Sequence, residues 1–534
     1  MPDKKYLPWW QKEVIYQVYP RSFMDINHDG VGDLQGIINR LDYLEWLGIK
    51  AVWISPVYPS PLADFGYDIS DYQAIDSIYG TMDDFNQLMQ AAHSRKMKII
   101  MDLVPNHTSE KHDWFKESRS SKNNPKRDWY IWKDPGKNGE PPNNWISEFG
   151  GSAWQLDNAS GQYYYHTFLK EQPDLNWYNP EVRTAMWNTM RFWLRKGVDG
   201  FRIDVLWYLI KDEHFRDDPP NPDWEDGMPE HDKNIATFSS DQPQVHDVIA
   251  EMRKVADEFE DRLLIGEIYL PIAQLVNYYG KEKDSGVHLP FNFHLISTEW
   301  DAAELYKLIA EYEGAVADKG WPNWVLGNHD KSRIKTRIGE KQAWNAAMLL
   351  LTLRGTPTIY YGDEIGMEDA EIPRDKIVDP RELIEPGIGV GRDPERTPMQ
   401  WNSEKYAGFS ETETWLPVNP NYKSVNVESQ QNDPHSLLSF YRKIIQLRQK
   451  EPALYGGDYF PAGIKNQLFC YIREHKNNRF MICLNIGKEK VSYTHDFKWK
   501  GKTEIAKKPE AEGAELENTI TLEGGECLLV RLNS

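Results

Sequence analysis

Three carboxylates lie at the ends of short apolar segments that have the pattern of buried strands. Asp204 stands in GFRIDV, Glu267 in LLIGEI, and Asp330 shortly after WVLG. A carboxylate in an apolar strand is costly unless it is paired or functional. If the strands are parallel and close into one barrel, these side chains converge at its mouth. Two acids flanking a glycosidic bond can supply a nucleophile and a proton donor, and a third can hold hydroxyls and stabilise positive charge.

These acids have two other interpretations. Asp204 alone has a structural alternative, a salt bridge with Arg202 in the same segment, which the convergence of three acids disfavours. A metal-dependent barrel hydrolase would need a His-x-His pair after the first strand. The chain has Gln17-Val-Tyr-Pro-Arg21 there, so the sequence argues against a catalytic metal.

The elements that must position the acids alternate along the chain. Apolar strand-like segments are separated by polar loops and by segments such as 33–47 and 83–95, whose apolar residues recur at three- and four-residue spacing. This alternation predicts an α/β fold, a (β/α)8 TIM barrel. A doubly wound sheet is the alternative, but no GxGxxG follows the first strand. The expected strands are 14–18, 51–54, 98–104, 200–205, 263–268, 291–296, 324–327 and 356–361.

Two stretches interrupt the alternation, and the pattern changes near the end. Residues 108–177, after the third strand, are too long for a βα loop and are expected to form an inserted subdomain. Residues 364–414, after the eighth strand, form a long loop expected at the same barrel mouth. The catalytic barrel is therefore expected to comprise 1–107 and 178–457. Short alternating segments in 458–534 predict a C-terminal antiparallel β-sandwich domain.

Composition excludes several classes of partner. The 534 residues carry a net charge of −20, which disfavours nucleic acid and anionic membranes and suits a neutral small-molecule substrate. The longest apolar run, 346–353, is far shorter than the ~20 residues that span a bilayer. No secretory signal is recognisable at the N-terminus. The three cysteines, an odd and sparse number, favour a reducing compartment and a cytoplasmic enzyme. Whether the enzyme is a monomer or a homo-oligomer stays open.

Five motifs in order give the chain a family resemblance. DLVPNH, QPDLNW, GFRIDV, GEI and GNHD resemble the conserved regions of the α-amylase superfamily, glycoside hydrolase family 13. Further stretches, VYPRSF, ADFGYDISDY, GTPTIYYGDEIGM and RDPERTPMQW, resemble its α-glucosidase and oligo-1,6-glucosidase branch. YYG…GVHLPFNF and WLPVNPNY are most similar to the maltase-like group.

The resemblance implies a retaining double displacement, with carboxyls ~5 Å apart. Asp204 would be the nucleophile that forms a β-glucosyl ester. Glu267 would protonate the leaving oxygen and then activate water, which requires a raised pKa. Asp330 would bind hydroxyls of the distorted sugar, and Arg202 would keep Asp204 ionised.

Other residues would bind the non-reducing glucose according to the same resemblance. Tyr67 would stack under the sugar ring, and Asp64 would close the subsite. Arg396 would pair with Asp64 and grip the terminal 4-hydroxyl, with Arg392 as the other candidate. A pocket blocked beyond that hydroxyl makes an exo-acting enzyme. Two histidines would donate to sugar hydroxyls, His107 and His329.

A loop after the first strand resembles the start of an EF-hand, with oxygen ligands at positions 1, 3, 5 and 9 and Gly at 6. The twelfth position is Gly36 where an EF-hand needs Glu, and no helix is expected before the loop, so a calcium sensor is disfavoured. The resemblance implies instead a structural Ca2+ or Mg2+, and no organic cofactor; the other interpretation is an Asx-rich turn without an ion. The expected ligands are Asp25, Asn27, Asp29, Asp33 and the carbonyl oxygen of Val31.

The leading hypothesis is an exo-acting, retaining α-glucosidase that acts on maltose, sucrose or isomaltose-type substrates. Its linkage preference stays open, because Val205 with QPDLN resembles the α-1,6 pattern while the maltase-like stretches favour α-1,4 bonds and sucrose. A glucosyltransferase or sucrose isomerase could use the same site. A non-catalytic transporter-partner subunit is disfavoured, because such relatives tend to have lost the three acids.

Overall fold

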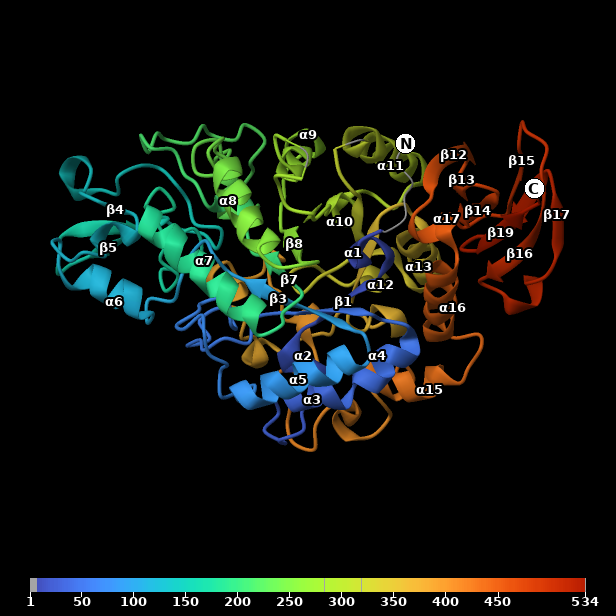
Figure 1. Ribbon diagram of the computed structural model, residues 1–534, viewed down its shortest axis with the longest axis horizontal. Helices are drawn as coiled ribbons and strands as arrows, with labels where there is room; N and C mark the ends of the chain where they lie inside the picture. Colours follow the sequence, from blue (N-terminus) through green and yellow to red (C-terminus); the bar gives the residue numbers. More distant parts are fainter. Residues whose placement is uncertain (1–6, 283, 318, 534) are drawn as a thin grey trace.

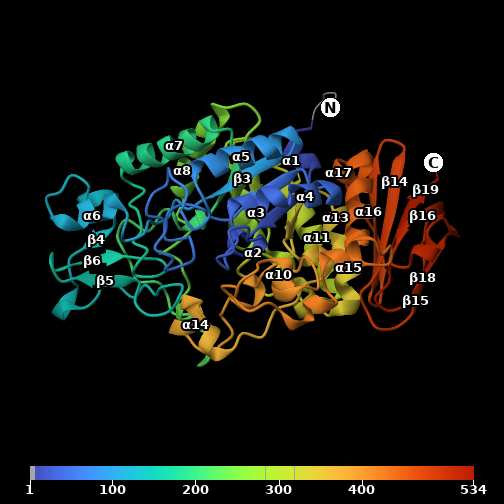
Figure 2. The ribbon, with the colours of Figure 1, turned by 90° about the horizontal axis from the view of Figure 1, so that it is seen from below.

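The computed structural model describes residues 7–282, 284–317 and 319–533. A barrel occupies its centre, a small three-stranded sheet lies at one end, and the C-terminal sheets lie at the other (Figures 1 and 2). The expected fold class, a (β/α)8 barrel with an insertion and a C-terminal β domain, is confirmed.

Eight parallel strands form the barrel wall in the order β10-β11-β1-β2-β3-β7-β8-β9. Among the described residues no ladder joins β9 to β10, but the backbone N–H of Asn292 donates to Asn323 Oδ1 across that seam (3.0 Å). The strands are β1 Ile15–Val18, β2 Ala51–Ile54, β3 Lys98–Leu103, β7 Gly200–Ile203, β8 Leu263–Gly266, β9 Leu289–Pro290, β10 Asn323–Val325 and β11 Thr356–Tyr360.

Alternation along these strands divides the apolar residues into two cores. Ile15, Trp53 and Ile265 belong to a cluster inside the barrel, whereas Tyr16 and Val52 belong to the core between the strands and the helices. Asp102 and Arg202 are register partners on β3 and β7, two residues beyond the buried Ile100 of β3. The same alternation therefore turns both charged side chains into the barrel, above its apolar interior.

The helices that cover the barrel begin where the sequence provides caps. Thr81 and Asp84 form a capping box at α5, and Asn179 caps α7 ahead of Pro180. The 33–47 segment forms two helices that meet at Arg40. The larger covering helices are α3 Leu34–Asn39, α4 Leu41–Leu47, α5 Met82–Ser94, α7 Pro180–Arg195, α8 Val245–Asp257, α11 Ala302–Val316, α13 Ala343–Thr352 and α16 Leu437–Lys450. Shorter helices are α1 Trp9–Lys12, α2 Pro20–Phe23, α9 Ile272–Leu275, α10 His294–Ser297, α12 Ile334–Ile338, α14 Pro380–Ile384, α15 Val427–Gln431 and α17 Pro452–Tyr455.

Two sequence expectations about these elements are wrong. The sixth strand lies at 289–290 and not at 291–296, because Asn292 Oδ1 accepts the N–H of His294 (3.1 Å) and α10 begins there. The Asx turn thus takes the backbone out of the sheet. A four-residue helix, α2, also precedes the EF-hand-like loop, where none was expected.

The two additions to the barrel are both antiparallel. The insertion contains α6 Asp113–Ser120 and a sheet ordered β4-β6-β5, of Trp132–Lys133, Gln162–Tyr165 and Trp154–Asp157. The C-terminal part pairs β12 Asp458–Lys465, β13 Leu468–His475, β14 Asn478–Asn485, β19 Cys527–Leu532, β16 Lys500–Ala506 and β17 Glu515–Glu517 in one sheet. A second sheet joins β15 Val491–Thr494 to β18 Thr519–Leu522.

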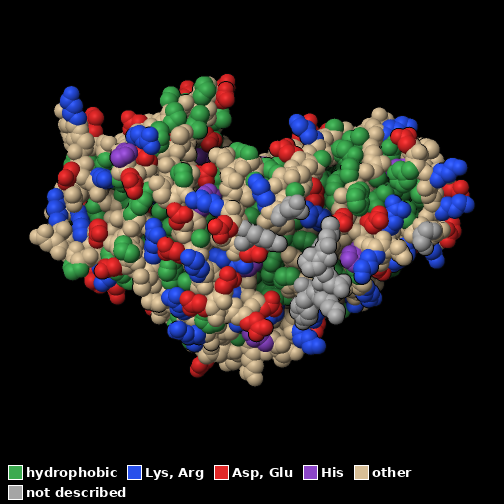
Figure 3. Space-filling model, turned by 45° about the horizontal axis from the view of Figure 1, so that its top comes forward, with side chains coloured by type: hydrophobic (Ala, Val, Ile, Leu, Met, Phe, Trp, Pro, Cys, Tyr) green, Lys and Arg blue, Asp and Glu red, His purple; other side chains and the backbone are tan. Residues whose placement is uncertain are grey.

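The distribution of surface charge and the character of the helices indicate which kinds of partner, such as a membrane, the chain could contact. Acidic and basic side chains are interspersed over the face drawn in Figure 3. None of the helices in the described parts of the chain has the length and apolar character needed to cross a membrane.

Candidate active site

A cavity of about 550 Å³ opens at the carboxyl ends of the barrel strands. It brings together eight residues that the sequence analysis named: Asp64, Tyr67, His107, Asp204, Val205, Glu267, Asp330 and Arg392. Three residues that are at most 1% exposed contact the acids of the cavity: Arg202 contacts Asp204 and Glu267, and His329 and Arg396 contact Asp330.

Arg202 is the central cation of the site. Its Nη1 donates to Asp204 Oδ1 (2.7 Å) and to Asp102 Oδ1 (2.9 Å), and its Nη2 lies 2.8 Å from Glu267 Oε2. One guanidinium thus holds two neighbouring cavity carboxylates and a third beneath them. Because all four groups are nearly or fully buried, their charges interact strongly.

The backbone directly after Asp204 is strained, and the strained residue contacts Glu267. Val205 has φ 38° and ψ 47°, a left-handed conformation that is unusual for a β-branched residue and costs about 1–3 kcal/mol. Its N–H donates to Glu267 Oε2 (2.9 Å). The turn therefore fixes Glu267 relative to Asp204 through the backbone.

Burial dominates the acidity of these two carboxyls. Burial raises the pKa of Glu267, more than Arg202 lowers it, as a proton donor requires. Burial also raises the pKa of Asp204; Arg202 lowers it, and nearby Glu267 and Asp102 raise it. The charge of Arg202 favours the ionised form of Asp204, but burial opposes it, so the expectation that Arg202 keeps Asp204 ionised stays a prediction. With one cation for three carboxylates, the pair of cavity acids holds a proton more firmly than exposed carboxyls would.

Asp330 has the opposite environment. Burial alone would raise its pKa, but His329, Arg396 and Arg392 together hold it well below the usual range. Arg396 Nη2 donates to Asp330 Oδ1 (2.7 Å), and Arg392 Nη1 lies 3.4 Å from the same oxygen. Asp330 is therefore a permanent anion that faces the cavity.

The structure corrects the expected partner of Asp64. Arg392, and not Arg396, pairs with Asp64, through Nη2 and Oδ1 at 2.8 Å. Asp379 holds the other side of Arg392, accepting from Nη2 (2.6 Å) and Nε (3.1 Å). The two arginines lie in one loop, RDPER, so sequence order could not tell which of them faces Asp64. Asp379 was missed because its VDPREL segment has no feature that distinguishes it from an ordinary loop.

The two histidines are almost completely buried and already contact protein partners. His107 Nε2 lies 3.1 Å from the carbonyl oxygen of Tyr67, and burial lowers its pKa to about 4. His329 Nε2 lies 2.6 Å from Tyr67 Oη, the two rings stack at 5.3 Å, and burial lowers its pKa to about 3. Both histidines are therefore neutral near pH 7. Their donation to a sugar stays a prediction, since a sugar hydroxyl would have to replace one of these contacts.

The outer wall of the cavity comes from loops that the sequence analysis did not select. Tyr208 Oη donates to Glu148 Oε1 (2.5 Å), and His231 Nε2 lies 3.9 Å from the other oxygen of Glu148. These residues link the insertion to the long segment between β7 and α8. The rest of that wall is largely aromatic or charged: Phe149, Phe168, Trp207, Asp232, Tyr269, Lys331 and Arg381.

The EF-hand-like loop has the donor chemistry for a hard cation. Its carboxylates are engaged within the loop: Asp25 accepts from the N–H groups of His28 and Gly30, and Asp33 from those of Ile26 and Asn27. Asp33 also caps α3 through the N–H of Gly36. Among the described residues the carboxylate oxygens of Asp25, Asp29 and Asp33 do not all converge within 4.8 Å. The oxygen set fits calcium or magnesium in type, but the carboxylates would have to draw closer.

Comparison with known proteins places this geometry among related enzymes. The model of the alpha amylase catalytic domain matches residues 17–457. An oligo-1,6-glucosidase of Parageobacillus thermoglucosidasius is 41% identical over 84% of this chain and 85% of its own. An alpha-glucosidase of Apis mellifera is 40% identical over 87% of this chain and 83% of its own. The crystal structure of XgtA, an alpha-glucosyl transfer enzyme, superposes with a TM-score of 0.93 at 36% identity, covering 99% of this chain and 100% of that one.

Proposed function

Since the chain belongs to the α-amylase family and is a glycoside hydrolase, we propose that it is an exo-acting, retaining α-glucosidase that releases glucose from the non-reducing ends of short α-glucosides. The observation that carries this proposal is the pair of acids, Asp204 and Glu267, held by adjacent nitrogens of Arg202 at the floor of the cavity. Sharing one guanidinium favours the short separation, about 5–5.5 Å, of retaining enzymes.

In the proposed mechanism Asp204 attacks the anomeric carbon and forms a β-glucosyl ester. Glu267 gives its proton to the leaving oxygen, which its raised pKa supports. The deprotonated Glu267 then takes a proton from water, which displaces Asp204 and leaves α-glucose. Asp330, permanently ionised, stabilises the positive charge that develops on the sugar ring and holds its hydroxyls.

Exo action is supported by the ion pairs at one end of the cavity. Asp64, Arg392 and Asp379 form a continuous buried chain there, which would meet the terminal hydroxyls of the first glucose and block a longer chain. The cavity volume of about 550 Å³ is typical of sites for small ligands and supports short substrates.

The linkage cut is the part of the proposal that an experiment must decide. Val205 and QPDLN favour α-1,6 bonds, and the maltase-like stretches favour α-1,4 bonds and sucrose. We would incubate the enzyme with equimolar maltose, isomaltose and sucrose and follow the anomeric protons by NMR. Early α-glucose supports a retaining hydrolase, and the order in which substrates disappear gives the linkage preference.

Glucosyl transfer is the second candidate, because the chain superposes closely on an alpha-glucosyl transfer enzyme. In that reaction a sugar, and not water, intercepts the ester. New disaccharide signals that outpace free glucose in the same NMR course would favour transfer. No change in any sugar would refute both candidates.

We also propose a structural Ca2+ or Mg2+ in the loop of Asp25, Asn27, Asp29, Val31 and Asp33. Five oxygen donors within nine residues support a hard cation. Such an ion would brace the loop between α2 and α3, with Asp25 already tied to Ser410 of the long loop (2.6 Å).

The proposed setting is the cytoplasm, with neutral saccharides as the substrates. All three cysteines are free and buried, which supports a reducing compartment. The net charge of −20 supports an uncharged ligand over nucleic acid.

A further inference from the structure

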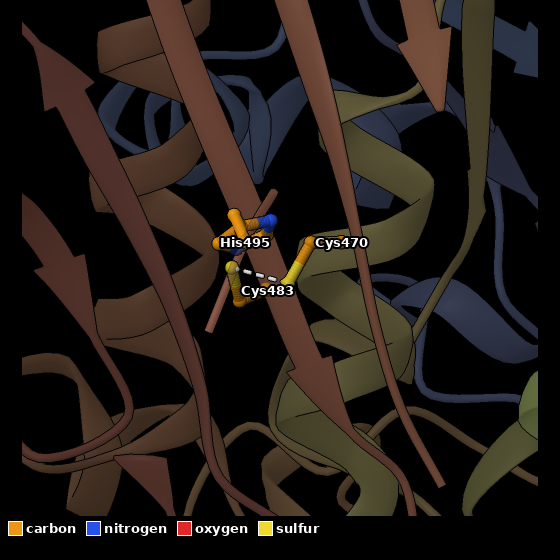
Figure 4. A group of neighbouring side chains, drawn as sticks. All are labelled: Cys470, Cys483 and His495. Carbon is orange, nitrogen blue, oxygen red and sulfur yellow. Dashed lines mark hydrogen bonds between the residues drawn. The ribbon is translucent and has the colours of Figure 1, made fainter. Parts of the chain in front are cut away.

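Two cysteines and a histidine meet between the two sheets of the C-terminal domain (Figure 4). Cys470 on β13 and Cys483 on β14 are directly opposed register partners, with their sulfur atoms 2.7 Å apart. His495 follows β15 of the smaller sheet. The ligand atoms of all three side chains lie within 4.8 Å of one another, and the residues are between 0% and 5% exposed.

The histidine is oriented as a metal ligand would be. Its Nδ1 lies 3.0 Å from the carbonyl oxygen of Ala462, which can only accept, so Nδ1 carries the proton. Nε2 therefore presents a lone pair, and it is buried without a hydrogen-bond partner. Metal-binding histidines commonly donate their second ring nitrogen to a carbonyl in this way, which fixes both tautomer and ring orientation.

We propose that Cys470, Cys483 and His495 form a zinc site that joins the two sheets of the C-terminal domain. Two thiolates and one imidazole are ligands that Zn2+ prefers, and water would complete four-coordination. Both thiols lose their protons to solvent when the ion binds, so affinity rises with pH. Zn–S bonds of about 2.3 Å in a tetrahedron separate the sulfur atoms by about 3.8 Å, so binding moves them about 1 Å apart.

A disulfide between the two cysteines is the competing explanation, since opposed strand positions bring their sulfur atoms together. A disulfide, however, leaves the Nε2 lone pair of His495 without a partner, whereas zinc uses it. The arrangement of His495 therefore favours the metal over a disulfide; a reduced Cys483 thiol could use the same lone pair, but only as a weak S–H donor.

The test uses the full chain, reduced and stripped of metal with a chelator. We would titrate it with Zn2+ against a chromophoric competitor, and with Co2+ while recording the thiolate-to-cobalt charge-transfer band. We expect one equivalent with that band, and a fall of at least about 100-fold in Zn2+ affinity for Cys483→Ser and for His495→Gln. Cys527→Ser is the matched control, because Cys527 is buried on the same sheet but packs in the other core cluster. It should bind like the wild type.

The outcomes that would overturn the proposal are distinct. One is Zn2+ affinity unchanged in His495→Gln, a variant that keeps both cysteines and whose fold is checked by circular dichroism. Another is metal uptake without the charge-transfer band, which would place the ion on oxygen ligands such as those of the loop at 25–33. A third is a mass lower by two hydrogens without reductant, together with no metal uptake after reduction, which would establish the disulfide. Glucosidase activity decides none of these, so its loss would not bear on the zinc site.

Discussion

Replacing Arg202 with methionine tests whether the site is held together by one buried cation. Arg202 is fully buried and contacts three carboxylates, those of Asp102, Asp204 and Glu267, at 2.9, 2.7 and 2.8 Å. Methionine fills part of the same space but leaves these anions without a partner. Breaking a buried ion pair by removing one member costs about 3–5 kcal/mol, so Arg202→Met should lower the free energy of unfolding by at least that amount at pH 7.5.

The loss should depend on pH with a definite sign. Burial already raises the pKa of Asp102 to about 6, and removing the cation would raise the pKa values of all three carboxyls further. As pH falls through these raised values the carboxyls bind protons and become neutral, so the difference between variant and wild type should shrink by pH 5.

Urea denaturation followed by tryptophan fluorescence, at pH 7.5 and pH 5, measures both quantities. Arg191→Met is the matched control, because Arg191 pairs with Glu258 at 2.5 Å on the surface, where such a pair contributes about 0–1 kcal/mol. A loss below about 1 kcal/mol in Arg202→Met at pH 7.5, or a loss equal at both pH values, would refute the reasoning.

Four further predictions follow from the same geometry. Asp204→Asn should lower kcat by more than about 10⁴-fold with an unchanged circular dichroism spectrum, and near-normal activity would exclude Asp204 as nucleophile. Asp379→Asn should loosen Arg392 and raise KM for maltose about tenfold, a loss of about 1.4 kcal/mol; a fall in kcat alone would contradict that positioning role. His107 has a folded pKa of about 4 against about 6.5 unfolded, so it alone should contribute about 3 kcal/mol to the loss of stability as pH drops from 6.5 to 4; His107→Gln should remove that contribution, and an unaltered slope would count against it. Chelation of Ca2+ and Mg2+ should lower the melting temperature more than the rate at 25 °C, with Asp29→Asn behaving like the chelated wild type; immediate loss of activity at constant melting temperature would make the ion catalytic.

The strands and the acids were predictable because their signals are local. The apolar residues before Asp204 and Glu267 must be buried, while the carboxylate that follows must reach a polar site. Few folds meet both requirements, and a barrel of parallel strands is one of them. Alternation along the strands also gives the inward direction of Asp102 and Arg202. Seven of the eight strands were placed in this way. The sixth failed because FNFHLI has a strand-like composition, while a single Asx turn at Asn292 ends the sheet.

The pairing of charges was not predictable, because it depends on distances across the chain. Asp64 and Arg392 are 328 residues apart, and Arg396 is an equally good partner by chemistry. Only the path of the 364–414 loop decides between them. The left-handed backbone of Val205 has no sequence signal either, because a β-branched residue is a poor choice for it. Tertiary contacts, including its N–H bond to Glu267, hold that conformation.

The difference between local and long-range signals explains why the type of reaction is easier to predict from this sequence than the linkage that is cut. In the proposed mechanism Asp204, Glu267 and Asp330 act on the glucose that every substrate shares, and the barrel strands alone fix their positions. The leaving sugar would contact the part of the cavity lined by Glu148, Tyr208 and His231, which the insertion and the segment after β7 bring together. Contacts of that kind are worth only about 1–3 kcal/mol each, enough to change preference by 10- to 200-fold. Substitutions in this wall should therefore exchange one linkage for another while hydrolysis of the common glucosyl ester keeps its rate.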